Sequence, residues 1–349
     1  MKTDNNEANN NEGQQAFAIE ESARHEGTWL IWPRIEHCDN GAEELDDIEW
    51  IWVEIVQALS DSEKVHIIAS DRTAERRIKW LLESEDIRLT NIDFIYADSD
   101  SFWTRDTGPI FAKDADGNAE ILDFTFNAWG EKCDAEGNAY TYNFDNEIPN
   151  VVAEARGITI VPNIDFVLEG GAFEFDGHGT IMACKSSVIN KNRNPKCGGE
   201  TELAEQYLKK YFGATNFIWL EGTCDDKDDI TDCHIDGLAR FFDSNTIVAL
   251  PEFFFPEGDY EELHKAKNAK GEKYEIVELP VDYDNEWLYI NYYIGNKVIL
   301  LPTCGEKVNL AVLKKISELY PNKEILPIDV TMLVDGGGAI HCITQQQPK

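Results

Sequence analysis

Short apolar segments recur along the chain, and each is bounded by turn residues. They start at Thr28 (TWLIWP), Thr107 (TGPIFA), Thr180 (TIMAC), Thr246 (TIVALP) and Lys297 (KVILLP), at intervals of 79, 73, 66 and 51 residues. Apolar runs of this length between turn residues are typical of buried β-strands. The recurrence therefore predicts five related units, each built around one buried strand.

Stretches with helical spacing lie between these segments. From Ile48 to Leu59 the apolar residues fall on one helical face, and residues 72–83, 202–212 and 308–320 show the same pattern. A strand-like run follows most of these helices, at residues 91–97, 216–220, 274–280 and 324–330. Five such units favour an α/β fold arranged as a propeller, although the same alternation also allows an ordinary α/β sandwich.

The first residues have a different composition from the rest of the chain. Residues 1–15 are rich in Asn, Glu and Gln and contain neither a basic stretch nor an apolar region. This composition predicts a disordered tail and not a signal peptide, followed by a single domain over residues 16–349. No apolar run approaches the ~20 residues needed to span a membrane. The eight cysteines lack the paired spacing of a disulfide scaffold or a zinc site, which predicts a cytoplasmic protein.

The charge of the chain limits its partners. There are 66 acidic and 31 basic residues, and the formal net charge is −35. Nucleic acid backbones are bound by clustered Lys and Arg, so binding of nucleic acid is excluded as a function class. A cationic substrate would be attracted by this field, but solubility or adaptation to salt accounts for the same charge. The charge alone therefore identifies no substrate.

Five polar segments with turn residues lie beside the predicted strands. Their sequences are WTRDTGP, LEGGAFEFDGHG, DCHIDGLARFFDSN, YINYYIGN and the terminal VDGGGAIHC. If the five units surround a common axis, these segments meet at one central cavity. The arrangement predicts a site assembled from residues that are far apart in the sequence.

Cys342 is the first candidate in that site. It follows a triple-glycine turn and His341, and such a turn presents a thiol to a pocket because glycine permits a close backbone approach. A thiolate is a strong nucleophile, and nearby positive charge favours its formation. His341 would point away from Cys342 on an extended backbone, so we expect it to be structural. A role as small buried hydrophobes is favoured for Cys38, Cys133, Cys184 and Cys304.

His234 and Asp236 are separated by one residue in DCHIDG, a segment expected to be a strand. Alternation along a strand would point both side chains to one face and into one pocket. Glu169 precedes two glycines, and Asp106 lies in WTRDTGP. Carboxylates beside glycines are often only turn formers, but here they recur at equivalent places of the units.

This set of residues suits chemistry on a guanidinium group. Two carboxylates bind a planar guanidinium through paired N–H bonds, and they are stabilised by its charge. A thiolate attacks the guanidinium carbon, and a histidine protonates the departing nitrogen and then activates water. A third carboxylate orients the imidazole. The sequence therefore indicates a thiol hydrolase acting on a guanidinium substrate.

The ordered motifs resemble those of the agmatine deiminases, in the guanidino-modifying pentein superfamily and near the bacterial-type peptidylarginine deiminases. The resemblance runs from about Thr28 to Pro348 through TWLIWP, FWTRDTGP, FNAWGEK, LEGGAFEFDGHGT, NKNRNP, TDCHIDGLARF, YINYYIGNKVILLP and GGGAIHCITQQQP. It implies a fivefold pseudosymmetric α/β propeller that hydrolyses agmatine to N-carbamoylputrescine and ammonia through a thiouronium intermediate. It also implies that no metal or organic cofactor takes part.

Site roles follow from the matched motifs. The resemblance implies that Cys342 is the nucleophile, His234 the general acid and base, and Glu169 the group that orients His234. Asp106 and Asp236 would bind the guanidinium. Further residues in matching motifs are expected to line the pocket, namely Trp103, Trp129 and Asn291.

Two departures from the family pattern bear on specificity. Ala339 replaces an asparagine of GGGNIHC, and Cys233 replaces a glycine before His234. Both departures leave the catalytic groups in place, but they affect how the protein recognises the end of the substrate opposite the guanidinium. Deimination of peptidylarginine or free arginine therefore stays an alternative, as does a silent binder of guanidines or polyamines. A homo-oligomer is also compatible with the sequence.

Overall fold

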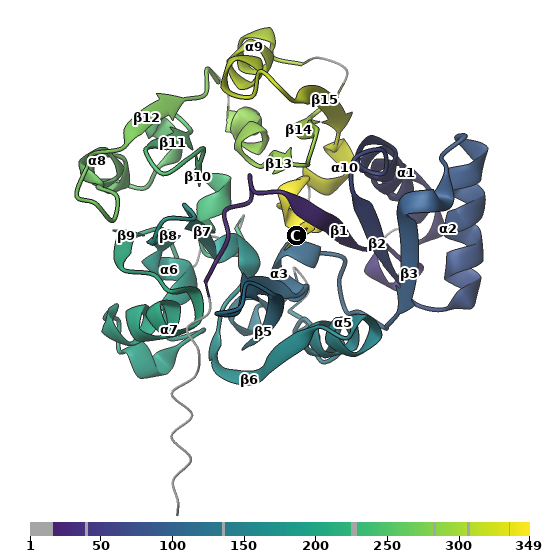
Figure 1. Cartoon of the computed structure of the whole chain (residues 1–349), viewed down its shortest axis with the longest axis horizontal. Coiled ribbons are helices and arrows are strands. Elements are labelled where there is room, and N and C mark those ends of the chain that lie inside the picture. Colours follow the sequence, from purple (N-terminus) through teal and green to yellow (C-terminus); the bar gives the residue numbers. More distant parts are fainter. Residues whose placement is uncertain are drawn as a thin grey trace, which may run out of the picture.

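Five small sheets surround a central axis in this computed structural model (Figure 1). The structure describes residues 17–38, 41–134, 137–224, 229–281, 284–305, 308–334 and 336–349. The predicted fivefold α/β propeller is confirmed. The predicted tail, residues 1–15, lies outside the described residues, so the domain boundary stays a prediction.

Four sheets share one topology of three strands. In each, an inner strand runs antiparallel to a central strand, and the central strand runs parallel to an outer one. In the order inner, central and outer strand, the first sheet contains β4 (Ile110–Lys113), β5 (Ala119–Thr125) and β6 (Thr159–Val167), and the second contains β7 (Phe173–Phe175), β8 (Thr180–Cys184) and β9 (Asn216–Leu220). The third contains β10 (Ala239–Phe241), β11 (Thr246–Ala249) and β12 (Glu275–Glu278), and the fourth contains β13 (Tyr293–Ile294), β14 (Val298–Thr303) and β15 (Glu324–Asp329).

The fifth sheet joins the two ends of the chain. The C-terminal strand β16 (Gln345–Pro348) pairs antiparallel with β1 (His25–Ile31), which is followed by the parallel strands β2 (Lys64–Ala69) and β3 (Ile92–Tyr96). β16 therefore occupies the inner position that β4, β7, β10 and β13 hold in the other sheets. This pairing closes the ring and fixes the position of the segment just before β16, which carries Cys342.

All five apolar segments contain strands, but one of them holds a different place in its sheet. The segments at Thr28, Thr180, Thr246 and Lys297 form the central strands β1, β8, β11 and β14. The segment at Thr107 instead supplies the inner strand β4, and the central strand of that sheet is β5. β4 is as apolar and buried as a central strand, whereas β5 contains the polar Glu120 and Asp123.

Helices pack on the sheets through the apolar faces that the sequence predicted. The longest are α1 (Ala42–Leu59), α2 (Arg72–Ser84), α5 (Ile148–Arg156), α7 (Glu202–Phe212), α8 (Asp259–Lys265) and α9 (Leu310–Leu319). Single-turn helices are α3 (Thr104–Thr107), α4 (Ala128–Glu131), α6 (Lys185–Val188) and α10 (Thr331–Val334). The 3-10 turns are η1 (Ile35–His37), η2 (Leu89–Asn91), η3 (Asp145–Glu147), η4 (Gly170–Ala172), η5 (Pro195–Cys197), η6 (Ile235–Gly237), η7 (Glu252–Phe254), η8 (Asp284–Ile290) and η9 (His341–Ile343).

The core consists of side chains from the sheets and from the inner faces of the helices. Trp29 and Trp52 are fully buried in its larger part, which also contains Ile55 and Leu59 of α1. Among the described residues, no helix has the length and apolarity needed to cross a membrane. The cytoplasmic location stays a prediction.

Candidate active site

Five short helical turns surround the axis, and each lies directly before an inner strand. They are α3, η4, η6, η8 and η9, which precede β4, β7, β10, β13 and β16. These turns contain or adjoin the five polar segments that the sequence analysis singled out. The geometry brings Asp106, Glu169, His234, Asp236, Asn291 and Cys342 together, as the hydrogen bonds between them show.

Cys342 lies in η9, half-buried and beside two of the other predicted residues. Its Sγ is 3.4 Å from Asn291 Oδ1 and 4.0 Å from Asp236 Oδ2. The Nδ2 of Asn291 donates in turn to Asp236 Oδ2 at 3.3 Å. Asn291 therefore connects the thiol to the carboxylate and fixes both at one wall of the site.

His234 is held between two carboxylates. Its Nε2 lies 3.1 Å from Glu169 Oε2, and its Nδ1 lies 3.8 Å from Asp106 Oδ1. The expectation that residues 234–236 form a strand was wrong, because His234 is the N-cap of η6 and Asp236 lies inside that turn. The two side chains still enter one site, since the tight turn brings both toward the axis.

The two predicted tryptophans have different surroundings. Trp129 is buried, and its Nε1 donates to Asp106 Oδ2 at 2.9 Å, so it holds the carboxylate in place. Trp103 lies under the glycine turn, where a Cβ on Gly338 would meet its ring at 2.3 Å. Trp103 is not among the described residues that line the cavity beside Cys342. Its packing explains why the turn before Cys342 requires glycine at residue 338.

Burial and charge set the protonation of the site. Burial alone would lower the pKa of His234, but Asp106, Glu169 and Asp236 together raise it to about 9. Burial raises the pKa of Asp106, and the nearby charges of Glu169 and Asp236 act in the same direction against the attraction of His234. His234 is therefore protonated at neutral pH in the empty site.

The thiol of Cys342 keeps its proton in the empty site. Burial raises its pKa well above the usual range, and repulsion from Asp236 and Asp106 adds to this effect. A cation placed among these carboxylates would offset the repulsion.

Arg193 was missed as a site residue, although its motif NKNRNP was noted. It is buried, its Nε donates to Glu169 Oε1 at 3.0 Å, and its Nη1 donates to Asp232. Burial alone would raise the pKa of Glu169, but Arg193 and His234 lower it. Arg193 therefore keeps Glu169 ionised beside His234. No local pattern marks this role, because the partners lie 24 and 39 residues away in the sequence.

A cavity of about 540 Å³ opens beside Cys342 and His234. Its wall is largely apolar on one side, where Phe253, Phe254 and Trp287 lie, and these aromatic residues were also missed. Asp229 and Asp236 are acidic residues of the lining, and none of the described lining residues is a lysine or arginine. The cavity is thus suited to a small cation with an apolar chain.

Two further predictions about side chains can be compared with the structure. Arg105 adjoins Asp106, and strand alternation would turn its side chain the other way. It does point away from the cavity, but it lies in the helical turn α3 and not in a strand, with its Nη1 donating to Gln346 Oε1 at 2.8 Å. Cys184 is buried as expected, whereas Cys133 and Cys304 are exposed and Cys38 is half-buried, so the prediction for these three was wrong.

The whole described chain matches one family. A family model described as Porphyromonas-type peptidyl-arginine deiminase matches residues 17–348. The chain belongs to this family. Its members are enzymes of the guanidino-modifying type, which hydrolyse C–N bonds. Two relatives carry the provisional name agmatine deiminase. The protein from Mycoplasma mycoides subsp. mycoides is 31% identical to this chain over 358 residues, and the alignment covers 93% of each chain. The protein from Legionella pneumophila is 31% identical over 341 residues, again with 93% of each chain covered.

Solved structures of the family share the fold. A cysteine-to-serine variant of the C. jejuni agmatine deiminase with substrate bound has a TM-score of 0.79 at 29% identity, with 97% of this chain and 98% of that chain covered. A provisionally named arginine deiminase from Porphyromonas gingivalis has a TM-score of 0.80 at 31% identity, with coverages of 96% and 99%. The family thus includes structures whose names give different substrates.

The raised pKa of His234 predicts a pH-dependent contribution to folding stability. Because the folded-state pKa of about 9 exceeds the unfolded value of 6.5, protonated His234 stabilises the fold fully below about pH 6.5. This stabilisation, on the order of 3 kcal/mol, is lost as the pH rises toward 9. Urea unfolding of the natural protein and of His234→Gln between pH 6 and 9.5 measures it. The free energy of unfolding should fall more steeply for the natural protein, and parallel curves would contradict the assignment.

Proposed function

We propose that this protein is a cysteine-dependent agmatine deiminase, which hydrolyses agmatine to N-carbamoylputrescine and ammonia. The observation that carries the proposal is the placement of Cys342, protonated His234 and Asp236 in the lining of one cavity, with Asp106 3.8 Å from His234. The family membership and a related structure named as an agmatine deiminase with substrate bound support it.

The guanidinium would bind between the two aspartates. Gly171 lies at this point, and a Cβ there would come within 2.6 Å of His234 Nδ1 and 3.1 Å of both Asp106 Oδ1 and Asp236 Oδ2. The absence of a side chain at Gly171 therefore lets the backbone approach the imidazole and both carboxylates closely, and it holds the three groups together on one side of the proposed guanidinium site. Paired N–H bonds from a guanidinium to these carboxylates fix its plane.

Binding of the cation would activate the nucleophile. The substrate charge offsets the carboxylate repulsion that keeps Cys342 protonated, so the thiol releases its proton to solvent water as the substrate binds. The thiolate Sγ then forms a bond to the guanidinium carbon. Protonated His234 donates its proton to the departing nitrogen, the C–N bond breaks, and ammonia leaves a thiouronium on Cys342.

The second half of the reaction would use the same histidine as a base. Neutral His234 accepts a proton from water, the hydroxide attacks the thiouronium carbon, and the C–S bond breaks. As the C=O bond of the product forms, the hydroxyl proton passes to the departing sulfur, so the carbamoyl product leaves and the Cys342 thiol is regenerated, with His234 again protonated. Glu169 holds the imidazole through both steps because its carboxylate accepts from Nε2 and is itself fixed by Arg193.

The charge of the cavity favours agmatine over arginine. Arginine carries a carboxylate near the end opposite the guanidinium, and a cationic side chain would be needed to pair with it. The described lining contains Asp229 and no lysine or arginine, while Arg105 lies away from the cavity with its Nε donating to the carbonyl of His341. An amine is the better match for an acidic lining.

The oligomeric state is a separate question, and the homo-oligomer stays a prediction.

Substrate identity is tested by ammonia release from agmatine, free arginine and a blocked peptidylarginine, offered in parallel. Agmatine should be the preferred substrate, and Cys342→Ala should lower turnover by roughly 10⁴-fold or more because it removes the nucleophile. Circular dichroism of the variant controls for folding. Turnover of peptidylarginine alone would assign the other substrate of the family, and full activity of Cys342→Ala would refute the mechanism.

The close packing at Gly171 gives a second test, with a matched control. Gly171→Ala should lower kcat/KM for agmatine by about a hundredfold, because the new methyl group would displace His234, Asp106 and Asp236 from their positions. Gly237→Ala is the control, since Gly237 lines the cavity but its Cβ would meet nothing within 4 Å. Equal activity of the two variants would show that the reaction does not depend on the positions of these three side chains.

A further inference from the structure

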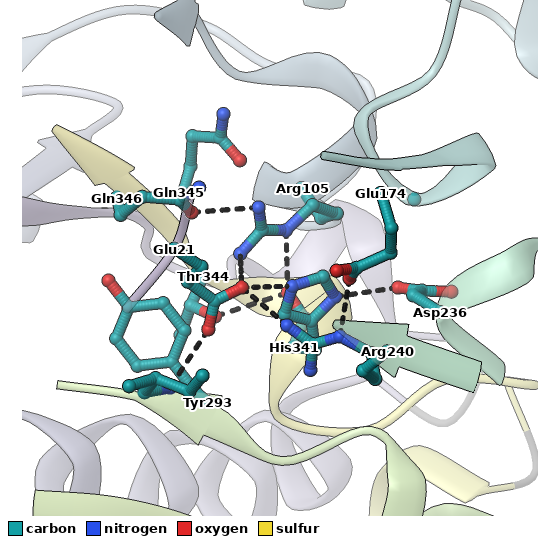
Figure 2. Close-up of polar contacts among 12 residues, drawn as sticks. Glu21, Arg105, Glu174, Asp236, Arg240, Tyr293, His341, Thr344, Gln345 and Gln346 are labelled. Atoms are coloured by element: carbon teal, nitrogen blue, oxygen red, sulfur yellow. Dashed lines mark hydrogen bonds and ion pairs between the residues drawn. The ribbon is translucent and has the colours of Figure 1, made fainter. Parts of the chain in front are cut away.

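A second polar cluster lies on the axis behind the candidate active site (Figure 2). Its members are Glu21, Arg105, Glu174, Arg240 and His341, all buried. They come from four of the inner segments and from the chain before β1. His341 connects this cluster to the active site, because it is adjacent to Cys342 and contacts Asp236.

The imidazole of His341 lies between two carboxylates. Its Nδ1 is 2.7 Å from Asp236 Oδ2, and its Nε2 is 2.7 Å from Glu21 Oε2 (Figure 2). A neutral imidazole has one N–H and can donate to only one of these oxygens, whereas an imidazolium donates to both. The geometry therefore favours a His341 that carries a proton on each nitrogen.

The charges around His341 support the same state. Burial alone would raise the pKa of Glu21, but the charges of Arg240, His341 and Arg105 lower it well below its usual range, whereas burial raises the pKa of Glu174. Protonated His341 pairs with the ionised Glu21 and Asp236, which offsets the cost of burying two carboxylate charges. Burial alone would raise the pKa of Asp236, but the hydrogen bond and the charge of His341 lower it.

Glu21 is firmly positioned, although it precedes the first strand. Its Oε1 accepts from the backbone N–H of Ile294 at 2.9 Å, and its Oε2 accepts from Arg240 Nη2 at 2.5 Å. Phe17 also pairs through its backbone with Lys113 of β4, which fixes the segment across the inner strands. The segment thus presents one carboxylate to the back of His341.

Ion pairs with Arg240 explain this cluster better than a bound metal ion does. Glu21, Glu174 and His341 offer ligand atoms within 4.8 Å of one another. Arg240, however, donates to both carboxylates. Its guanidinium already supplies the positive charge that a metal ion would bring.

We propose that Glu21 and His341 form a positioning pair that keeps Asp236 ionised and correctly placed for the substrate guanidinium. The pair touches no reacting atom and acts through Asp236. The N-terminal segment is then part of the catalytic unit, because it supplies the carboxylate that keeps His341 protonated. This inference rests on the proposed function.

The test uses agmatine binding and turnover in four variants of the full chain. Glu21→Gln and His341→Gln should each weaken agmatine binding by about tenfold to a hundredfold, since each removes a hydrogen bond involving a charged group. Agmatine affinity is measured by calorimetry in the Cys342→Ala background, and KM and kcat in the active protein. KM should rise much more than kcat, because Asp236 acts in binding.

Glu174→Gln is the matched control. It removes a buried carboxylate from the same cluster and from the same Arg240, but it leaves the contacts of His341 with Glu21 and Asp236 in place. Its affinity for agmatine should change less than about threefold. If Glu21→Gln and Glu174→Gln weaken binding equally, the cluster is only structural and the proposal is wrong.

The double variant distinguishes an effect of Glu21 that acts through His341 from two independent effects on agmatine binding. If Glu21 acts through His341, Glu21→Gln combined with His341→Gln should bind agmatine no more weakly than the worse single variant. Multiplied effects would overturn the proposal. If Glu21→Gln fails to fold, the comparison of His341→Gln with Glu174→Gln decides. Absence of agmatine binding and turnover in the parent proteins would overturn the proposed function itself, and that result is distinct from a failure of the variants alone.

Discussion

Burial of several carboxylates around one small cavity is the constraint on which the rest of this structure depends. Asp106, Glu169 and Asp236 are all nearly inaccessible to water, and like charges in such surroundings raise one another's pKa. The fold stabilises two of them from behind, Glu169 through Arg193 and Asp236 through His341. Within the described part of the chain, Asp106 accepts hydrogen bonds from two neutral donors, Trp129 and the Gly171 backbone, and its nearest positive charge is His234 at 3.8 Å.

This difference between the partners of Asp106 and those of Glu169 and Asp236 explains how the site can accept a cation. The pKa of Asp106 is raised while those of Glu169 and Asp236 are lowered, so the carboxylates differ in how readily they ionise. A guanidinium between Asp106 and Asp236 would supply the charge that Asp106 lacks. Because the same repulsion raises the pKa of Cys342, the proposed binding of one cation would both pair Asp106 with a positive charge and favour formation of the thiolate.

The sequence predicted the members of the site better than their local structure. Cys342, His234 and Asp106 were found because each lies beside glycines or turn residues in a recurring position. The strand expected over residues 234–236 is a 3-10 turn, since alternation was inferred from two polar residues and not from a longer run. The Thr107 segment forms a buried strand as predicted, but its inner place in the sheet could not be predicted, because apolar composition does not distinguish an inner strand from a central one.

Other parts of the site left no signal that one sequence could show. Glu21 and His341 are 320 residues apart, and Glu21 lies in a segment without periodicity. Such pairs become visible only when the ring closes, because pairing of β1 with β16 brings both ends of the chain to the axis. Ring closure therefore does more than complete a sheet. The pairing of β16 with β1 also places Cys342 and His341 against Asp236 and Asn291. The sheet of β16, β1, β2 and β3 and the candidate site are therefore completed by the same segment.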